Sequence, residues 1–292
     1  MKNQCFNKQN LSEQVNEVCK STMSKDEKCK ALIKLGFTPY ECEFVLRTNQ
    51  SGFGFTFGVE IECLMMRSRL VEAARANGMP YQYEGYNHSD NHSHYKFVTD
   101  ASISGADGIE CVSPILNGND EGFNSLKNCC MTLNEAGACV NRSTGLHVHI
   151  GVKGMSDIWF INIFANYQKL ERVIDTFMAH SRRDNNNGYC KSLQGFNFTN
   201  GCNTIGDVQN TLSSRYFKVN PMSIRRHGTI EFRQHQGTTD FEKISNWVRF
   251  VAKLVEWSAK NVLNSAITTI DEIPFINESE KLFFKTRAAA LR

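Results

Sequence analysis

The sequence predicts an α+β fold in which helices cover one face of a largely antiparallel sheet. The first observation is a set of short stretches that alternate apolar and polar residues as strands do: FTFGVEIECLM, KFVTDASISG, GIECVSPIL, STGLHVHIGV and GTIEFRQHQGT. The second is two longer stretches with helical periodicity, residues 157–181 and the segment after Thr239. The third is their order, because strands that come in runs without regularly alternating helices disfavour a parallel sheet.

The start of the chain is predicted to form a separate helical appendage. Residues 1–50 are polar, with one short helix that ends at Gly36 and a second that begins at Thr38 and Pro39. The stretch NQSGFGF is typical of a linker. We expect the appendage to serve docking or substrate recognition, with a helix-turn-helix DNA reader as the alternative. The main domain is expected to span residues 51–292.

The predicted strands each have an apolar face and an ionisable face. Alternate side chains of a strand share a face, so Glu60 and Glu62 of FGVEIEC lie together, as do His147 and His149 of GLHVHIG. The ionisable faces together hold Glu60, Glu62, Glu110, His147, His149, Glu231, Arg233 and His235. A merely solvent-exposed face is the alternative. Such faces favour Thr, Ser and mixed charges, however, and like charges this close lower stability unless a cation neutralises them.

The two predicted helices supply the layer that covers the sheet. Residues 157–181 are predicted to form a long, mostly buried helix. The last helix is expected to start at TTDFEKI, where Thr239 and Glu242 have the spacing of a capping box. Its apolar residues recur at helical intervals and form one core stripe: Ile244, Trp247, Val248, Val251, Leu254 and Val255.

Composition disfavours several classes of protein. The chain has 33 Lys and Arg against 30 Asp and Glu, a net charge of +3 that gives little support to nucleic-acid binding. No apolar run approaches the length of a membrane span, and MKNQCFNKQNLSEQ has no signal-peptide core. The patterns GxGxxG and GxxxxGK[ST] are absent, which disfavours a Rossmann or P-loop domain. We expect a soluble, cytoplasmic protein without a membrane or nucleic-acid partner.

Cysteine usage fits a reducing compartment. There are 11 cysteines, an odd number, and no CxxC that would indicate a structural zinc site. Reduced, mostly buried thiols are therefore expected. A catalytic cysteine with a histidine partner is the alternative.

The ionisable face has the chemistry of a site for hard divalent cations. Carboxylates in number suit Mg²⁺ or Mn²⁺, and an imidazole fits Mn²⁺ well. Zinc is disfavoured because HExxH is absent. Several carboxylates together with an arginine on one rigid sheet indicate two or more ions that hold a polyphosphate. Further positive charge is available from Arg182, Arg183, Arg215 and Lys218, although the first two could instead complement a helix C-terminus.

The ordered motifs resemble a known family. GVEIE, TDxS, IExVSPIL, GLHVHIG, SRR, RYxxxN and TIEFRQHxGT occur in this order over roughly residues 53–258. This set resembles the amidoligase family of carboxylate–amine ligases, which is similar in fold to glutamine synthetase and γ-glutamylcysteine ligase. The resemblance implies a curved, largely antiparallel sheet with helices on its convex face and with metal and ATP in its concave face. It also implies that ATP phosphorylates a carboxylate and that an amine then attacks the acyl phosphate.

The resemblance assigns roles to individual residues. The metal ligands it implies are Glu60, Glu62, Glu110, His147 and Glu231. Nucleotide or phosphate contacts are expected from His149, Arg215, Arg182 and Lys218. Arg233 is expected to hold the γ-phosphate or the developing acyl phosphate, and Glu231 and Glu60 complete the catalytic set. Substrate contacts are expected from Asn220, Asp100 and His88, with a plain turn as the alternative for Asp100.

Two points are left open by the motifs. Glutamine synthetase carries an additional metal-ligating acid near its equivalent of Glu110, where this chain has Asn117 and Gly118, so the number of ions is open. Asp120 or Glu121 could substitute for that acid. The second point is the segment YNHSDNHSHY, residues 86–95, which is expected to be a lid or substrate-gating loop, with a transition-metal site as the alternative.

The predicted activity is ATP-dependent amide formation. The carboxylate and amine would belong to amino acids, peptides or a protein side chain, giving a peptide or isopeptide bond, with ATP and Mg²⁺ or Mn²⁺ as cofactors. The alternatives are a phosphotransferase of the guanidino-kinase type, a metal-dependent hydrolase and a catalytically inactive binding module that retains the sheet.

Overall fold

The computed structural model describes residues 14, 17–18, 21, 23–37, 42, 53–85, 87 and 93–292. The chain divides into two compact units, Met1–Gly52 and Phe53–Arg292. In the first unit, helix α2 (Lys25–Lys34) begins after Ser24, which forms a capping box with Glu27. The helix predicted to start at Thr38 and Pro39 lies outside the described residues at its beginning, and the function of this unit stays a prediction.

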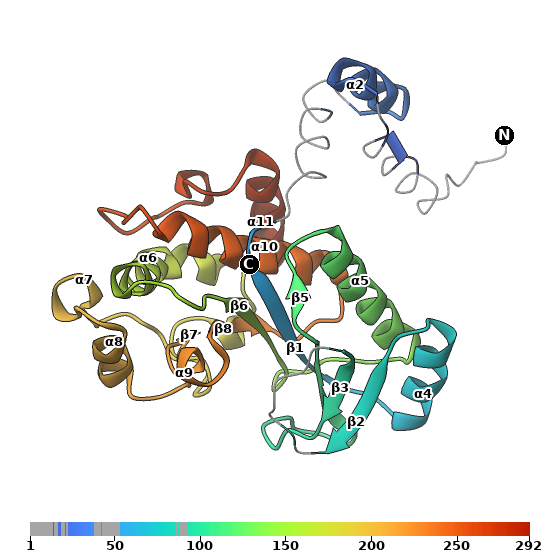
Figure 1. The fold of residues 1–292 in the computed structure, drawn as a ribbon, viewed down its shortest axis with the longest axis horizontal. Helices are drawn as coiled ribbons and strands as arrows, with labels where there is room; N and C mark the ends of the chain where they lie inside the picture. Colours follow the sequence, from blue (N-terminus) through green and yellow to red (C-terminus); the bar gives the residue numbers. More distant parts are fainter. Residues whose placement is uncertain are drawn as a thin grey trace. The chain divides into compact units, whose positions relative to one another are not determined.

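The second unit is built on one mostly antiparallel sheet (Figure 1). The strand order is β2 (Tyr81–Gly85), β3 (Tyr95–Val98), β4 (Gly108–Val112), β1 (Thr56–Leu64), β6 (Gly145–Gly151), β8 (Thr229–Gln236) and β7 (Val219–Asn220), and β5 (Leu116–Asn117) pairs with the start of β1. Among these described strands, β2 and β3 pair in parallel and the other neighbours are antiparallel. The predicted mixture of helices with a largely antiparallel sheet is confirmed.

Three long helices cover one face of this sheet. They are α5 (Asp120–Glu135), α6 (Asp157–Thr176) and α10 (Phe241–Ser258), and Figure 1 shows them on the same side of the strands. Val59, Val148 and Phe232 of the sheet share one apolar core with side chains of these helices. Burial of that apolar area is the main favourable term in folding. It leaves the ionisable face of the strands on the other side, uncovered by these helices.

Shorter helices complete the second unit. They are α4 (Arg67–Ala76), α7 (Phe198–Gly201), α8 (Ile205–Leu212), α9 (Ser223–His227) and α11 (Glu278–Ala290), with 3₁₀ turns at His180–Arg182 and Ile270–Glu272. Of these, α9 lies between β7 and β8 in the chain and reaches the ionisable face, where Arg226 and His227 line a cavity.

Helix α10 begins one residue later than a capping box at Thr239 would place it. The side chain of Asp240 accepts hydrogen bonds from the backbone N–H groups of Glu242 and Lys243. Thr239 donates its hydroxyl to Asn134 instead. The predicted capping box is wrong because Asp240, a strong N-cap whose charge also suits the helix N-terminus, takes that position.

Strand β8 does not alternate to its end. Its register against β6 shifts between Leu146 and Val148, which marks a β-bulge next to Arg233. Beyond the bulge His235 pairs with Leu146 on the apolar side, and its ring packs on Trp247 at a centroid separation of 5.8 Å. The prediction that His235 shares a face with Arg233 is therefore wrong. Burial, followed by the charge of Arg287, lowers the pKa of His235 to about 3, so the ring is neutral in this core.

The described cysteines match the expectation of unpaired thiols. None of them forms a disulfide, and most are buried, with Cys139 exposed. Burial raises the pKa of Cys63 to about 12, so this thiol is a poor nucleophile at neutral pH. Among the described residues, no helix combines the length and the apolar character needed to cross a bilayer.

Candidate metal centre

Strand register brings the ionisable residues of the central strands side by side. Glu60 of β1 pairs with His147 of β6, and Glu62 pairs with Glu110 of β4. His149 of β6 pairs with Glu231 of β8. Directly opposite residues of an antiparallel pair have Cβ atoms about 4.5–5.5 Å apart. The backbone of the sheet therefore fixes the centre, and no loop is needed to assemble it.

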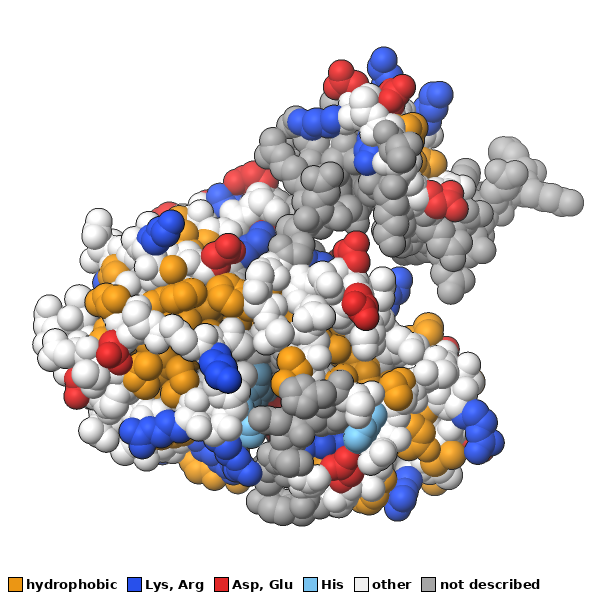
Figure 2. Space-filling view, viewed as in Figure 1, with side chains coloured by type: hydrophobic (Ala, Val, Ile, Leu, Met, Phe, Trp, Pro, Cys, Tyr) orange, Lys and Arg blue, Asp and Glu red, His pale blue; other side chains and the backbone are white. Residues whose placement is uncertain are grey.

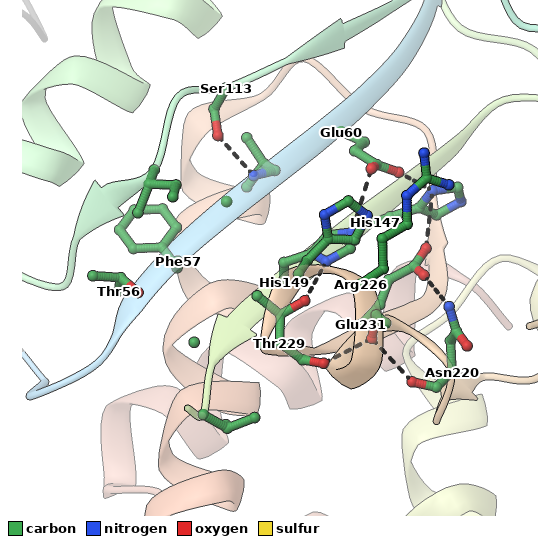
Figure 3. A pocket seen from close by; sticks show the side chains of 18 of the residues that line it. Thr56, Phe57, Glu60, Ser113, His147, His149, Asn220, Arg226, Thr229 and Glu231 are labelled. Carbon is green, nitrogen blue, oxygen red and sulfur yellow. Dashed lines mark hydrogen bonds and ion pairs between the residues drawn. The ribbon is translucent and has the colours of Figure 1, made fainter. Parts of the chain in front are cut away.

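His147 lies in the middle of the centre (Figure 3). Its Nδ1 is 2.9 Å from Glu60 Oε2 and 3.6 Å from Glu231 Oε1, and its Nε2 is 3.7 Å from Glu62 Oε1. The neighbouring His149 places Nε2 3.3 Å from Glu60 Oε1 and bonds Thr229 through Nδ1. The sequence-predicted ligands thus converge around one imidazole.

Two overlapping groups of side chains can hold a cation. One contains Glu60, His147 and Glu231, and the other contains Glu62, Glu110 and His147, with candidate ligand atoms within 4.8 Å of one another in each group. Four carboxylates and one imidazole form an oxygen-rich donor set of the kind that Mg²⁺ and Mn²⁺ take. Because His147 belongs to both groups, two neighbouring ion positions would share it or compete for it.

The pKa values of the carboxyl groups show how unevenly positive charge is distributed. Burial raises the pKa of Glu110, and the charges of Glu60 and Glu62 raise it further, to well above its ordinary value. Burial also acts to raise the pKa of Glu60, but the hydrogen bonds of His147 and His149 outweigh it and hold that pKa well below the ordinary range. The two imidazoles thus offset the burial of Glu60, whereas burial and like charge dominate at Glu110.

Arginine supplies positive charge at the other half. Arg233 bonds Glu231, and Asn220 of β7 donates its amide to the second carboxylate oxygen of Glu231. Burial acts to raise the pKa of Glu231, but the guanidinium of Arg233 outweighs it and holds that pKa below its ordinary value. Burial lowers the pKa of Arg233, yet Glu231 and Glu60 raise it above the ordinary value, so the side chain stays cationic. Glu231 is thereby held ionised in one orientation.

A cavity of about 760 Å³ opens over this centre. Several sequence-predicted residues line it: Glu60, Asp100, Glu110, His147, His149, Arg215, Asn220, Glu231 and Arg233. In Figure 2, histidine side chains are visible near the middle of the face, in the region where Figure 1 shows β1 and β6. Glu62 lies just beyond the lining, where its carboxylate accepts a 2.6 Å hydrogen bond from the backbone N–H of Gly145.

Two predicted phosphate ligands lie elsewhere. Lys218 is fully buried, and its Nζ lies 2.8 Å from Glu171 and 2.7 Å from Asp175, both on α6. Arg182 is also buried and donates to the backbone oxygen of Thr144 at 2.6 Å. Neither residue lines the cavity. The structure thus gives Lys218 two carboxylate partners inside the protein. It places Arg182 at the start of β6, where a Cβ atom built at Gly145 would lie 2.9 Å from Arg182 Nη2 and 3.1 Å from His147 Nε2.

The remaining predicted substrate residues have different outcomes. Asp100 lines the cavity, and its carboxylate also accepts a 2.6 Å hydrogen bond from the backbone N–H of Ser102, so a turn role and a substrate role are both compatible with its position. His88 lies outside the described residues and stays a prediction. Arg215 lines the cavity with an exposed side chain, and its guanidinium lies over the Tyr216 ring at 5.2 Å.

Three cations that sequence reasoning missed also line the cavity: Lys96, Lys153 and Arg226. Lys96 pairs with Val112 of β4, and Val112 pairs with Glu60 of β1, so all three side chains share one face of the sheet. The alternation of KFVTD was the sequence signal that could have placed Lys96 on that face. Lys96 is 3% exposed and donates to the backbone oxygen of Asn87. No comparable pattern marks Arg226, which reaches the cavity from the short helix α9.

The fold and the site together define a protein with a cluster of carboxylates and imidazoles that could hold a cation, in a cavity on the open face of a largely antiparallel sheet. The chain matches the family described as "Putative amidoligase enzyme" over residues 54–195 and 202–255. The chain belongs to this amidoligase family, whose name indicates an amide-forming ligase, and the predicted resemblance is confirmed. No curated protein matches the chain.

Proposed function

We propose that the protein is an ATP-dependent carboxylate–amine ligase that forms an amide bond through an acyl phosphate. The observation that carries the proposal is the pair of carboxylate–imidazole groups around His147, next to Arg233, in one cavity over the open face of the sheet. Family membership supports amide formation. We also propose that the sheet is of the glutamine synthetase type, because its cation centre lies on the face opposite the helices.

The centre offers two places for a divalent ion. Glu60, His147 and Glu231 would hold one, and Glu62 with Glu110 would hold the other. Bound Mg²⁺ or Mn²⁺ would neutralise phosphate and carboxylate charge, which allows an anionic nucleophile to approach. The raised pKa of Glu110, due to burial and to Glu60 and Glu62, supports a second ion, because a cation there would favour the ionised carboxylate.

The chain's own cations would act on the transferring phosphoryl group. Arg233 keeps its charge in a buried setting and is held by Glu231, so it is pre-oriented to stabilise negative charge that develops on the phosphoryl oxygens. Burial acts to lower the pKa of His149, but its bond to Glu60 raises that pKa above the ordinary value, which favours an imidazolium beside phosphate.

The substrates would be an amino acid, a peptide or a protein side chain, each presenting a carboxylate or an amine to the cavity. Asn220 and Asp100 line the cavity and are placed to contact such groups. Buried Lys96 adds a cation on the same face that suits a carboxylate.

The experiment that tests the function is a screen of amino-acid and peptide pairs for ADP release with Mg·ATP, with each product weighed by mass spectrometry. We expect ADP release together with a product whose mass equals condensation of the pair. Glu60→Gln is expected to lower kcat by roughly 10²-fold or more, because the variant removes a ligand from the centre. Glu256→Gln is the matched control, since this glutamate is exposed on α10. A stable phosphorylated product without an amide would replace ligation by phosphotransfer.

A further inference from the structure

The guanidinium of Arg182 takes the place of a side chain at the start of β6. Gly145, His147 and His149 alternate along this strand and share its ionisable face. A Cβ atom built at Gly145 would lie 2.9 Å from Nη2 and 3.2 Å from Nη1 of Arg182. A side chain at this position would have to displace the guanidinium, so glycine leaves the room that Arg182 fills beside His147.

Hydrogen bonds hold the guanidinium in this place. Nη2 donates to the backbone oxygens of Thr144 at 2.6 Å and Ser143 at 3.4 Å, and Nη1 donates to the sulfur of Cys190 at 3.9 Å. The side chain is 3% exposed, and its Nε–H has no hydrogen-bond partner within the part of the chain that the structure describes. Because burying a cation with an unpaired N–H opposes folding, the stability of the turn alone does not account for this position.

The backbone that Arg182 bonds also orients a carboxylate of the cation centre. The N–H of Gly145 donates to Glu62 Oε2 at 2.6 Å, and Glu62 Oε1 is 3.7 Å from His147 Nε2. His147 belongs to both groups of side chains that can hold a cation. A shift of the backbone at Thr144 and Gly145 would therefore move a carboxylate and the shared imidazole together.

We infer that Arg182 is a positioning residue of the cation centre, which fixes Glu62 and His147 through the backbone at Thr144 and Gly145. The inference rests on the proposed function and adds to it a residue outside the cavity lining. Groups that orient the ligands of a metal contribute to its binding, and their substitution lowers metal affinity by about 10- to 100-fold.

The inference is tested by titrating MnCl₂ into Arg182→Lys and following free Mn²⁺ by electron paramagnetic resonance. Lysine keeps the positive charge, so direct repulsion of the ion is retained, but it lacks the planar fork that bonds Thr144 and Cys190 together. We expect the variant to bind Mn²⁺ roughly 10- to 100-fold more weakly than wild type. Arg183→Lys is the matched control and should bind Mn²⁺ as wild type does, because Arg183 donates to the backbone oxygens of Met178 and Leu291 instead.

A second variant probes the same contact from the strand. Gly145→Ala should also weaken Mn²⁺ binding, because its methyl group displaces the guanidinium. The losses in Gly145→Ala and Arg182→Lys are expected to be less than additive in the double variant, as for residues that act through one contact. Each titration is made well below the unfolding temperature of the protein in use, so a loss of stability alone leaves the affinity unchanged.

The outcomes separate the inference from the proposed function. Wild-type Mn²⁺ affinity in Arg182→Lys, or losses that add in full, would overturn the inference and leave the centre in place. If Arg182→Lys does not fold, Gly145→Ala decides, and an unchanged Mn²⁺ affinity in that variant contradicts the inference. A wild-type protein that binds no Mn²⁺ would overturn the proposed function as well.

Discussion

At the scale of single residues, the centre is assembled at a cost in electrostatic stability. Glu62 and Glu110 face each other across β1 and β4, both almost fully buried. Burial and the neighbouring carboxylates raise the pKa of Glu110 well above its ordinary value. Like charges in a low-dielectric interior destabilise the fold unless a cation lies between them. In the proposed function, these residues would favour ion binding at the expense of stability in the ion-free protein.

Glu110→Gln is predicted to stabilise the ion-free protein and to weaken its binding of Mn²⁺. Burial and the neighbouring carboxylates raise the folded-state pKa of Glu110 above the ordinary value of 4.5. The protonated carboxyl therefore contributes its full stabilisation below pH 4.5, and this contribution is lost as the pH rises through the folded-state pKa. Urea unfolding in EDTA should show the variant gaining stability over wild type as the pH rises from 4.5 towards neutrality. A constant difference between the two proteins at all pH values would refute this electrostatic account.

At the scale of elements, two internal contacts set the position of the strands that carry the centre. Gln234 of β8 lies on the helix side of the sheet, as Phe232 does, and the bulge turns His235 to the same side. There Gln234 accepts a 2.6 Å hydrogen bond from Tyr167 of α6. Beside it, Lys218 joins the segment leading into β7 to Glu171 and Asp175 of α6. The backbone oxygen of Lys218 also accepts from the N–H of Arg233 at 2.8 Å. A polar network under the sheet thus holds the strand that presents Arg233.

Lys218→Met is predicted to destabilise the protein by about 3–5 kcal/mol, because it leaves two buried carboxylates without their cation. Lys281→Met is the matched control, since its pair with Glu278 joins residues of one helix at the surface and is worth less than about 1 kcal/mol. Denaturant midpoints measure both effects. If Lys218→Met unfolds at the same midpoint as the control, Lys218 does not act as an internal clamp.

At the scale of the whole molecule, the proposed ion binding would be linked to folding. A ligand that binds only the folded state adds RT ln(1 + [L]/Kd), about 2.7 kcal/mol at one hundred times Kd. The centre is made by strands from widely separated parts of the sequence, so an unfolded chain has no comparable site.

Millimolar MnCl₂ or MgCl₂ is therefore predicted to raise the melting temperature by several degrees, roughly 2–4 °C per kcal/mol for a chain of this size. EDTA should reverse the shift. The double variant Glu60→Gln with Glu231→Gln should lose most of it, while the Glu256→Gln control keeps it. An undiminished shift in the double variant would place the ion elsewhere.

The sequence carried enough information for the sheet and for most of the centre. Alternation over β1, β4, β6 and the first part of β8 predicted which side chains share the open face, because strand geometry enforces a period of two. It did not reveal His235, whose face changes at a bulge, since a bulge adds one residue without any fixed sequence signal. Lys218 was missed as an internal ion-pair partner because its two carboxylates come from a distant helix.

By itself, then, the sequence determined the family, most of the strand faces and the acids and imidazoles that line the proposed centre, because these follow from local periodicity and from motif order. Only the tertiary structure decided which cations face the cavity and which are enclosed, as the contrast between Arg226 and Lys218 shows. The physical reason is that a side chain's charge and size are local properties, whereas its burial and its partners depend on segments far apart in the chain.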